Sequence, residues 1–188
     1  MFSPDSYVAA VRFAAERHRG QTVTGSELPY LVHVTSVTAE LIAALPGSGL
    51  DGDLAVACGL LHDTIEDTAD SDDAKLALAA EIERRFGTAV RDGVLALSKH
   101  KTSGGKALAK AEQMADSLRR IREQPHTVWA VKLADRITNL APPPSHWDRP
   151  KCAAYRLEAR TILEALGEAS PQLAARLQDR IGSYAAYC

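Results

Sequence analysis

The sequence has no long hydrophobic run. Its longest uninterrupted apolar stretch, near Leu54–Leu61, is far shorter than the roughly 20 residues that a membrane-spanning helix needs. The N-terminus also lacks the basic segment followed by an apolar segment that is typical of a signal peptide. We therefore predict that the chain neither spans a membrane nor binds one, and we expect a cytoplasmic location.

An excess of charge of one sign is also missing. The 22 basic and 24 acidic residues give a formal net charge of -2. Proteins that bind duplex DNA or RNA usually carry a basic surface, so a nucleic acid polymer is not the expected partner. The three cysteines, Cys58, Cys152 and Cys188, are an odd number without metal-like spacing, which predicts free thiols rather than a disulfide framework.

Linkers and aromatic residues are scarce as well. No Gly/Ser/Pro-rich or like-charged run is long enough to separate two domains, so we expect a single domain over residues 1–188. Aromatic residues make up only 5% of the chain, whereas alanine and leucine are abundant. This balance favours closely packed helices over sheets, and the predicted fold class is all-α.

Hydrophobic residues recur at helical spacing along most of the chain, and proline or glycine marks the ends of these segments. Residues 53–63 are apolar on all sides, which predicts a buried central helix that leads directly into His62-Asp63. The polar, basic, glycine-bearing residues 99–105 are predicted to form a loop. The predicted helices cover residues 4–20, 31–45, 53–63, 72–86, 88–98, 106–123, 126–140, 150–166 and 171–186.

Four potential metal ligands lie beside apolar helical segments: His33, His62, Asp63 and Asp135. Taken singly, a buried histidine is often a hydrogen-bonded core residue, and Asp135 next to Arg136 has the pattern of an ion pair. Burying several such groups is costly unless something compensates their charge, and a divalent cation does so while holding an activated water. Two imidazoles with two carboxylates suit Mn²⁺, Fe²⁺, Co²⁺ or Zn²⁺.

Two further acids, Glu66 and Asp67, follow within about one helical turn of His62-Asp63. A carboxylate beside an activated water can orient it, take its proton or protonate a leaving oxygen. The alternative is a solvated acidic turn, which is our interpretation of the acidic residues from Asp70 onward. Glu66 and Asp67 are therefore candidate catalytic residues.

The order and context of these residues resemble the HD superfamily of metal-dependent phosphohydrolases. The longer motifs resemble one branch, the hydrolase domain of RelA/SpoT proteins and its stand-alone small relatives, the alarmone hydrolases of the stringent response. The resemblance covers nearly the whole chain and leaves no room here for a synthetase or regulatory domain. The matching segments are residues 18–33, residues 59–68 (GLLHDTIEDT), Phe86-Gly87 and residues 132–140 (KLADRITNL).

The resemblance implies roles for individual residues. It makes the four potential ligands, His33, His62, Asp63 and Asp135, the ligands of one Mn²⁺, and it makes Glu66 and Asp67 the acids that activate water. It also implies an HD-type helical bundle. The substrate contacts that it implies are Asn139, Lys101, Lys151 and Tyr155. The i,i+4 spacing of Asn139 from Asp135 independently puts both side chains on one helix face.

The sequence departs from the family at Val23-Thr24, where relatives that act on guanine alarmones typically carry an Arg-Lys pair. Arginine can stack on a purine while its charge attracts phosphate, and neither valine nor threonine can do this. An adenine alarmone is therefore a credible substrate beside the guanine one.

These observations predict a Mn²⁺-dependent 3′-pyrophosphohydrolase of the alarmones (p)ppGpp or (p)ppApp, with the nucleotide as its small-molecule partner. One alternative is an HD phosphatase acting on a 5′-mononucleotide or on the 2′-phosphate of NADPH. Another is a non-catalytic regulator that binds metal or nucleotide, although such a protein would not need Glu66 and Asp67. The sequence leaves the oligomeric state open.

Overall fold

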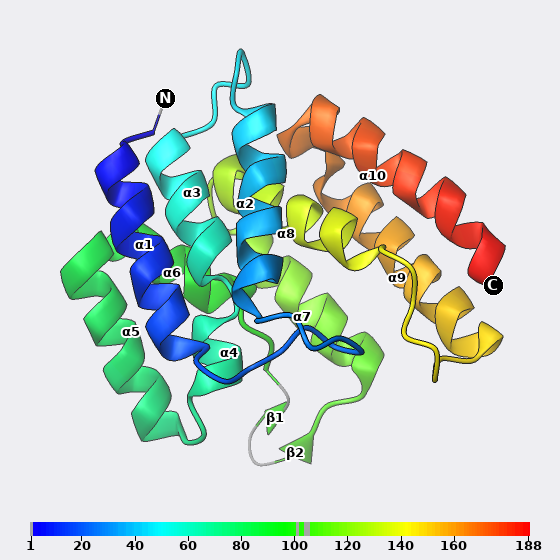
Figure 1. The fold of residues 1–188 in the computed structure, drawn as a ribbon, viewed down its shortest axis with the longest axis horizontal. Helices are drawn as coiled ribbons and strands as arrows, with labels where there is room; N and C mark the ends of the chain where they lie inside the picture. The colour runs from blue at the N-terminus through cyan, green and yellow to red at the C-terminus, as the bar shows by residue number, and fades with distance from the viewer. Residues whose placement is uncertain (1, 101, 104–105) are drawn as a thin grey trace.

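Helices make up most of the chain in the computed structural model, which describes residues 2–100, 102–103 and 106–188 (Figure 1). The all-α prediction is confirmed, with one short hairpin as the exception. In chain order, the elements are α1 (Pro4–Arg17), α2 (Leu31–Ala44), α3 (Gly52–Leu61), α4 (Thr64–Thr68), α5 (Asp72–Phe86), α6 (Thr88–Leu97), β1 (Thr102–Ser103), β2 (Lys106–Ala107), α7 (Lys110–Arg122), α8 (His126–Asn139), α9 (Arg149–Leu166) and α10 (Pro171–Ser183), with short 3-10 helices at Gly167–Ala169 and Tyr184–Tyr187.

The prediction of a helix from residue 106 was wrong at its start. Lys106 and Ala107 pair antiparallel with Ser103 and Thr102, and α7 begins only at Lys110. The helix is delayed because Ala109 has an extended backbone, and the Glu112 carboxylate accepts the Ala109 backbone N–H at 2.7 Å and so caps the first turn.

The predicted continuous helix over residues 53–63 is also interrupted. Helix α3 ends at Leu61, His62 caps it, and Asp63 precedes the short helix α4. His62 and Asp63 therefore lie between the two helices rather than within α3, and His62 is only 3% exposed. None of the helices in the described parts of the chain has the length and hydropathy to span a bilayer.

Helices α2, α3 and α8 pack side by side in the middle of the molecule, with α1, α5 and α6 towards one side and α9 and α10 towards the other (Figure 1). Helix α3 is buried along almost its whole length, and α8 is buried over most of its own. Gly59 allows the close contact of α3 with α2, because a Cβ at this position would lie 2.7 Å from Leu41 and 2.9 Å from Thr38. This close packing brings the start of α2 next to the end of α3.

Candidate metal centre

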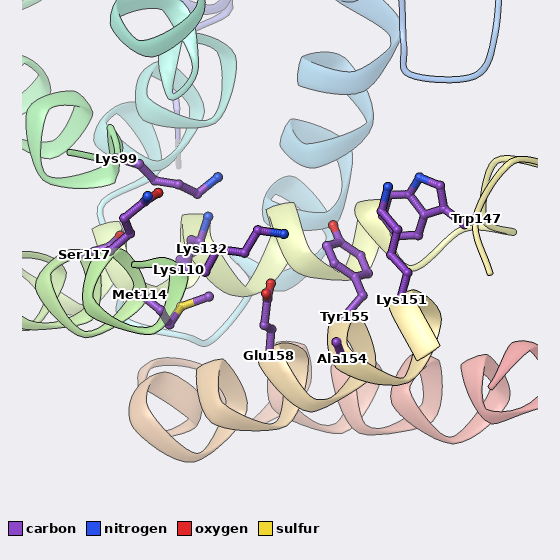
Figure 2. Close-up of a pocket in the computed structure, with 11 residues that line it drawn as sticks. Lys99, Lys110, Met114, Ser117, Lys132, Trp147, Lys151, Ala154, Tyr155 and Glu158 are labelled. Atoms are coloured by element: carbon purple, nitrogen blue, oxygen red, sulfur yellow. The ribbon is translucent and has the colours of Figure 1, made fainter. Parts of the chain in front are cut away.

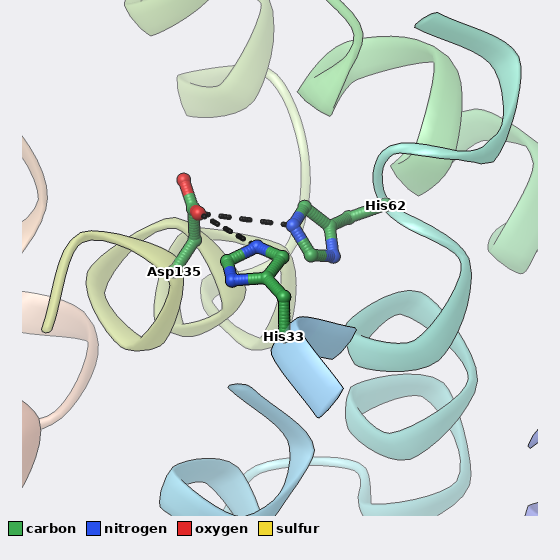
Figure 3. Close-up of side chains that lie close together, drawn as sticks. All are labelled: His33, His62 and Asp135. Carbon is green, nitrogen blue, oxygen red and sulfur yellow. Dashed lines mark ion pairs between the residues drawn. The ribbon is translucent and has the colours of Figure 1, made fainter. Parts of the chain in front are cut away.

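Three side chains from three different helical segments converge at the end of this central layer. His33 lies in the first turn of α2, His62 follows α3, and Asp135 lies in α8. Each offers one donor atom, and these atoms all lie within 4.8 Å of one another. The Nε2 atoms of His33 and His62 are 3.6 and 3.7 Å from Asp135 Oδ1 (Figure 3). All three side chains are buried, so the cluster is able to bind a metal ion.

Asp63 joins the same cluster. Its Oδ2 atom is 2.9 Å from His62 Nε2 and 3.5 Å from His33 Nε2. The hydroxyl of Tyr30 donates a hydrogen bond of 2.6 Å to this same oxygen, which limits the rotation of the carboxylate. The structure therefore brings all four predicted ligand residues together, although they are spread over about a hundred positions of the sequence.

The orientation of His62 suits a metal ligand. Its Nδ1 atom is 2.9 Å from the carbonyl oxygen of Gly59, which can only accept, so Nδ1 carries the proton. Among the described residues Nε2 has no partner with hydrogen-bond geometry, although two carboxylates lie nearby. With Nδ1 held as a donor, Nε2 is the ring nitrogen that can exchange its proton for a cation.

Asp135 is fixed by neighbours on its own helix. Lys132 donates to Asp135 Oδ2 at 2.7 Å, and the side-chain amide of Asn139 donates to Asp135 Oδ1 at 2.5 Å. This confirms that Asn139 and Asp135 share one helix face. The alternative pairing of Asp135 with Arg136 is wrong: Arg136 points to Glu158, 3.5 Å away, and stacks over Tyr155 at 4.2 Å.

The electrostatics of the cluster follow from its burial and mixed charges. Burial alone would lower the pKa of His62, but Asp63 and Asp135 outweigh this effect and raise it to about 10. Burial would raise the pKa of Asp135, but Lys132 and the two histidines hold it well below the usual range. The two histidines likewise hold the pKa of Asp63 well below its usual range against the effect of burial, so both carboxylates are ionised at neutral pH and their field favours a bound cation.

Glu66 and Asp67 lie on α4 beside this cluster and have different partners. Glu66 Oε2 accepts the backbone N–H of Lys99 at 2.9 Å, and the Lys99 ammonium is 3.8 Å from Glu66 Oε1. Asp67 Oδ2 accepts a hydrogen bond of 3.0 Å from Gln21 Nε2. Sequence reasoning missed the contact of Lys99 with Glu66, because only tertiary packing joins this loop to α4.

A cavity of about 280 Å³ opens next to Lys132 and is rich in lysine (Figure 2). Two of the predicted substrate contacts, Lys151 and Tyr155, line it, whereas Lys101 lies outside the described residues. The lysines that line the cavity are Lys99, Lys110, Lys132 and Lys151. Ammonium groups gathered around one cavity suit a ligand with several phosphate groups.

A second cavity, of about 560 Å³, is lined by His33 of the cluster and by Asn139, which donates to Asp135. Two loops supply part of its wall, through residues 23–26 with Leu28 and through residues 141–145, and side chains of α2, α8 and α9 supply more. Trp147 and Tyr155 line both cavities and are in edge-to-face contact, with ring centroids 5.1 Å apart. Trp147 was not predicted from the sequence, although it lies four residues before Lys151.

The fold and the cluster together define the class of this protein: a helical bundle with a buried set of histidine and aspartate side chains able to bind a metal ion. A sequence model of the family described as "HD domain" matches residues 10–175. The chain therefore belongs to the HD domain family.

Particular relatives are similar to the chain over different lengths. Guanosine-3′,5′-bis(diphosphate) 3′-pyrophosphohydrolase MESH1 of Mus musculus is 30% identical, with 87% of this chain and 86% of the relative covered. The GTP pyrophosphokinase of Myxococcus xanthus is 37% identical over 68% of this chain, but the match spans only 16% of that protein. A solved structure described as a metazoan ortholog of SpoT that hydrolyzes ppGpp has a TM-score of 0.78 at 22% identity, with 97% of both chains covered. The last comparison shows that the two proteins share a fold.

Proposed function

We propose that this protein is a Mn²⁺-dependent hydrolase that removes the 3′-pyrophosphate from alarmone nucleotides of the (p)ppGpp or (p)ppApp type. The observation that carries the proposal is the convergence of His33, His62 and Asp135 in an HD domain, with Glu66 and Asp67 beside them. The MESH1 relatives, named for this activity, support it because the match covers most of both chains.

In this proposal, His33, His62, Asp63 and Asp135 hold the metal. Nitrogen and oxygen donors of this kind suit Mn²⁺ as well as Fe²⁺, Co²⁺ or Zn²⁺. When bound, the cation lowers the pKa of a coordinated water and neutralises charge that develops on phosphoryl oxygens. The Tyr30 hydroxyl orients the Asp63 carboxylate by donating a hydrogen bond to Oδ2.

The reaction we propose is attack of water on the phosphorus attached to the ribose 3′ oxygen. The bond between this phosphorus and the 3′ oxygen breaks, and pyrophosphate is released. Glu66 and Asp67 take the proton of the attacking water and supply one to the departing ribose oxygen. Glu66 is well suited to a fixed role, because both of its carboxylate oxygens face Lys99.

The two cavities accommodate the rest of the nucleotide in this proposal. Lys151 and the other lysines of the smaller cavity bind phosphate groups, and the nucleoside lies in the larger cavity near Asn139. Trp147 and Tyr155, which line both cavities, provide aromatic surface where the two parts of the ligand meet.

A substrate panel tests this function. Protein stripped of metal and reloaded with Mn²⁺ is incubated with ppGpp, ppApp, NADPH and 5′-mononucleotides, and released phosphate and pyrophosphate are measured separately. We expect pyrophosphate from an alarmone, no product after chelation, and release slowed roughly 10²- to 10⁴-fold with the Glu66→Gln variant. Release of phosphate from NADPH or a mononucleotide, without pyrophosphate from either alarmone, would refute the proposal.

A further inference from the structure

A chain of hydrogen bonds connects Asp67 to a buried histidine outside the metal cluster. Gln21 Nε2 lies 3.0 Å from Asp67 Oδ2, and Gln21 Oε1 lies 2.7 Å from His18 Nδ1. His18 is only 4% exposed, whereas Asp67 is exposed to solvent. An exposed carboxylate has several rotamers available. The hydrogen bond from Gln21 restricts the rotamer of Asp67, which is the more exposed of the two acids Glu66 and Asp67.

The charge on Asp67 determines the direction of every bond in the chain. An ionised carboxylate only accepts, so Gln21 must turn its NH₂ group towards Asp67 and its carbonyl oxygen towards His18. That oxygen in turn requires a donor, so His18 must carry its proton on Nδ1. The rest of the structure agrees, because His18 Nε2 is buried without a hydrogen-bond partner among the described residues. A proton on that nitrogen would be a buried donor left unsatisfied.

Further contacts restrict the side chains and the backbone of these hydrogen-bonded residues. The His18 ring stacks against Tyr30 with centroids 4.9 Å apart, and the Tyr30 hydroxyl donates to Asp63. The backbone of Gln21 is also tied at both ends of its loop: its N–H donates to the His18 carbonyl at 3.0 Å, and its carbonyl accepts the Tyr30 N–H at 2.9 Å. His18 is therefore connected to Asp63 through Tyr30 and to Asp67 through Gln21.

We propose that His18 and Gln21 are positioning residues: as the Nδ1–H tautomer, His18 fixes the Gln21 amide so that its NH₂ group holds the Asp67 carboxylate towards the reacting water. This inference rests on the proposed function for the role of Asp67, but not for the direction of the hydrogen bonds. Without the His18 donor, the Gln21 amide is free to flip and to turn its oxygen towards Asp67. Two acceptors would then face each other, and the carboxylate would rotate into solvent.

The tautomer is measured first, in metal-free protein and without any substrate. A two-bond ¹H–¹⁵N spectrum of protein labelled at its histidines distinguishes the two neutral tautomers, and the His18→Phe variant identifies the His18 signals. We expect the Nδ1–H form. The Nε2–H form would reverse the chain and overturn the proposal, whether or not the protein hydrolyses an alarmone.

The kinetic test uses variants matched in shape. His18→Phe keeps the stacking on Tyr30 but removes the donor, His18→Asn keeps a donor near the position of Nδ1, and Gln21→Met keeps the length of the side chain. We expect His18→Phe and Gln21→Met to lower kcat about 10- to 100-fold at unchanged metal content and KM, as is usual for a group that orients another. His18→Asn should recover most of this loss, and the distant Gln172→Met, which removes an unrelated amide contact on α10, should have no effect.

A double-mutant cycle then shows whether the effect passes through Asp67. In an Asp67→Asn background the carboxylate that Gln21 orients is absent, so His18→Phe should cost no further activity. An equal loss in both backgrounds, or failure of His18→Asn to recover activity in a variant that melts like the wild type, would refute the positioning role. If the wild type hydrolyses no alarmone, the proposed function fails and the tautomer measurement alone decides the inference.

Discussion

The metal cluster and the two cavities beside it are built in different ways. The cluster lies where helix segments meet in the core, and three of its four side chains have hydrogen-bond partners outside it: Tyr30 for Asp63, the Gly59 carbonyl for His62 and Lys132 for Asp135. The cavities are lined largely by loops and by side chains on helix surfaces, including residues 23–26 and 141–145. The candidate metal site is therefore placed by the packed core, whereas the proposed nucleotide contacts depend on segments that can change without disturbing that core.

Removing a candidate metal ligand should have the largest effect on activity, because it breaks the rigid cluster rather than the cavities. His62→Ala deletes one of the converging donors, so we expect loss of stoichiometric metal and a fall of turnover to background. Metal analysis and pyrophosphate release measure this directly. The exposed His126→Ala is the matched control and should change neither quantity. Normal metal content and turnover in the His62 variant would remove the cluster from the active site.

The acids beside the cluster should separate catalysis from metal binding. Glu66→Gln or Asp67→Asn should retain the metal but lower kcat by roughly 10²- to 10⁴-fold, the usual scale for a positioned acid or base. Asp70→Asn is the control, since it alters the adjacent solvated turn. A loss explained wholly by lower metal occupancy would make the two acids ligands instead.

A change in the lysine-lined cavity should affect binding more than chemistry. Lys151, whose ammonium lies 4.3 Å from the centre of the Trp147 ring, lines this cavity away from the four ligands. Lys151→Met should raise KM for an alarmone about tenfold and change kcat by less than about threefold, because it removes a charge that attracts phosphate. The control is Lys75→Met, which alters a lysine paired with Asp72 on the surface of α5. A selective fall in kcat would instead place Lys151 at the reacting atoms.

The choice of base should be a smaller effect again. Val23 and Thr24 line the larger cavity and offer neither a positive charge nor a planar group to stack on a purine. We therefore expect kcat/KM for ppGpp to exceed that for ppApp by less than tenfold, about 1.4 kcal/mol. Steady-state comparison on one preparation measures the ratio, and the Val23→Arg/Thr24→Lys double variant should shift it towards guanine. A guanine preference of tenfold or more in the wild type would contradict this expectation.

The smallest expected effect concerns stability of the metal-free protein. The pKa of His62 is raised from 6.5 to about 10 on folding, so the stability that its proton contributes is complete below pH 6.5 and is lost as the pH rises towards 10. Thermal melting in the presence of a chelator should show Tm falling by about a few degrees across this range. Added Mn²⁺ should flatten the curve, because the cation takes the place of the proton. A Tm of the chelated protein that does not change across this window would show that His62 is not held in the protonated form.

Much of the cluster was predictable because its candidate ligands lie in short, local contexts. His62 and Asp63 come at the end of an apolar helix, and Asp135 and Asn139 are one helical turn apart, so their faces follow from spacing alone. The contact of Lys99 with Glu66 was not predictable in this way, because the two residues are 33 positions apart and no sequence pattern connects them. The start of α7 was mispredicted for a similar reason, since a capping contact and a strand pair outweighed the helical pattern of residues 106–109.

By itself, the sequence determined the helical class and the ends of most helices and singled out the four candidate ligand residues, because hydrophobic period and capping act over a few residues. Only the tertiary structure decided which groups meet. It turned Arg136 away from Asp135 towards Glu158, joined Gln21 to Asp67, and set Trp147 between two cavities. These contacts depend on how closely α2, α3 and α8 pack, and that packing is a property of the whole core rather than of any one segment.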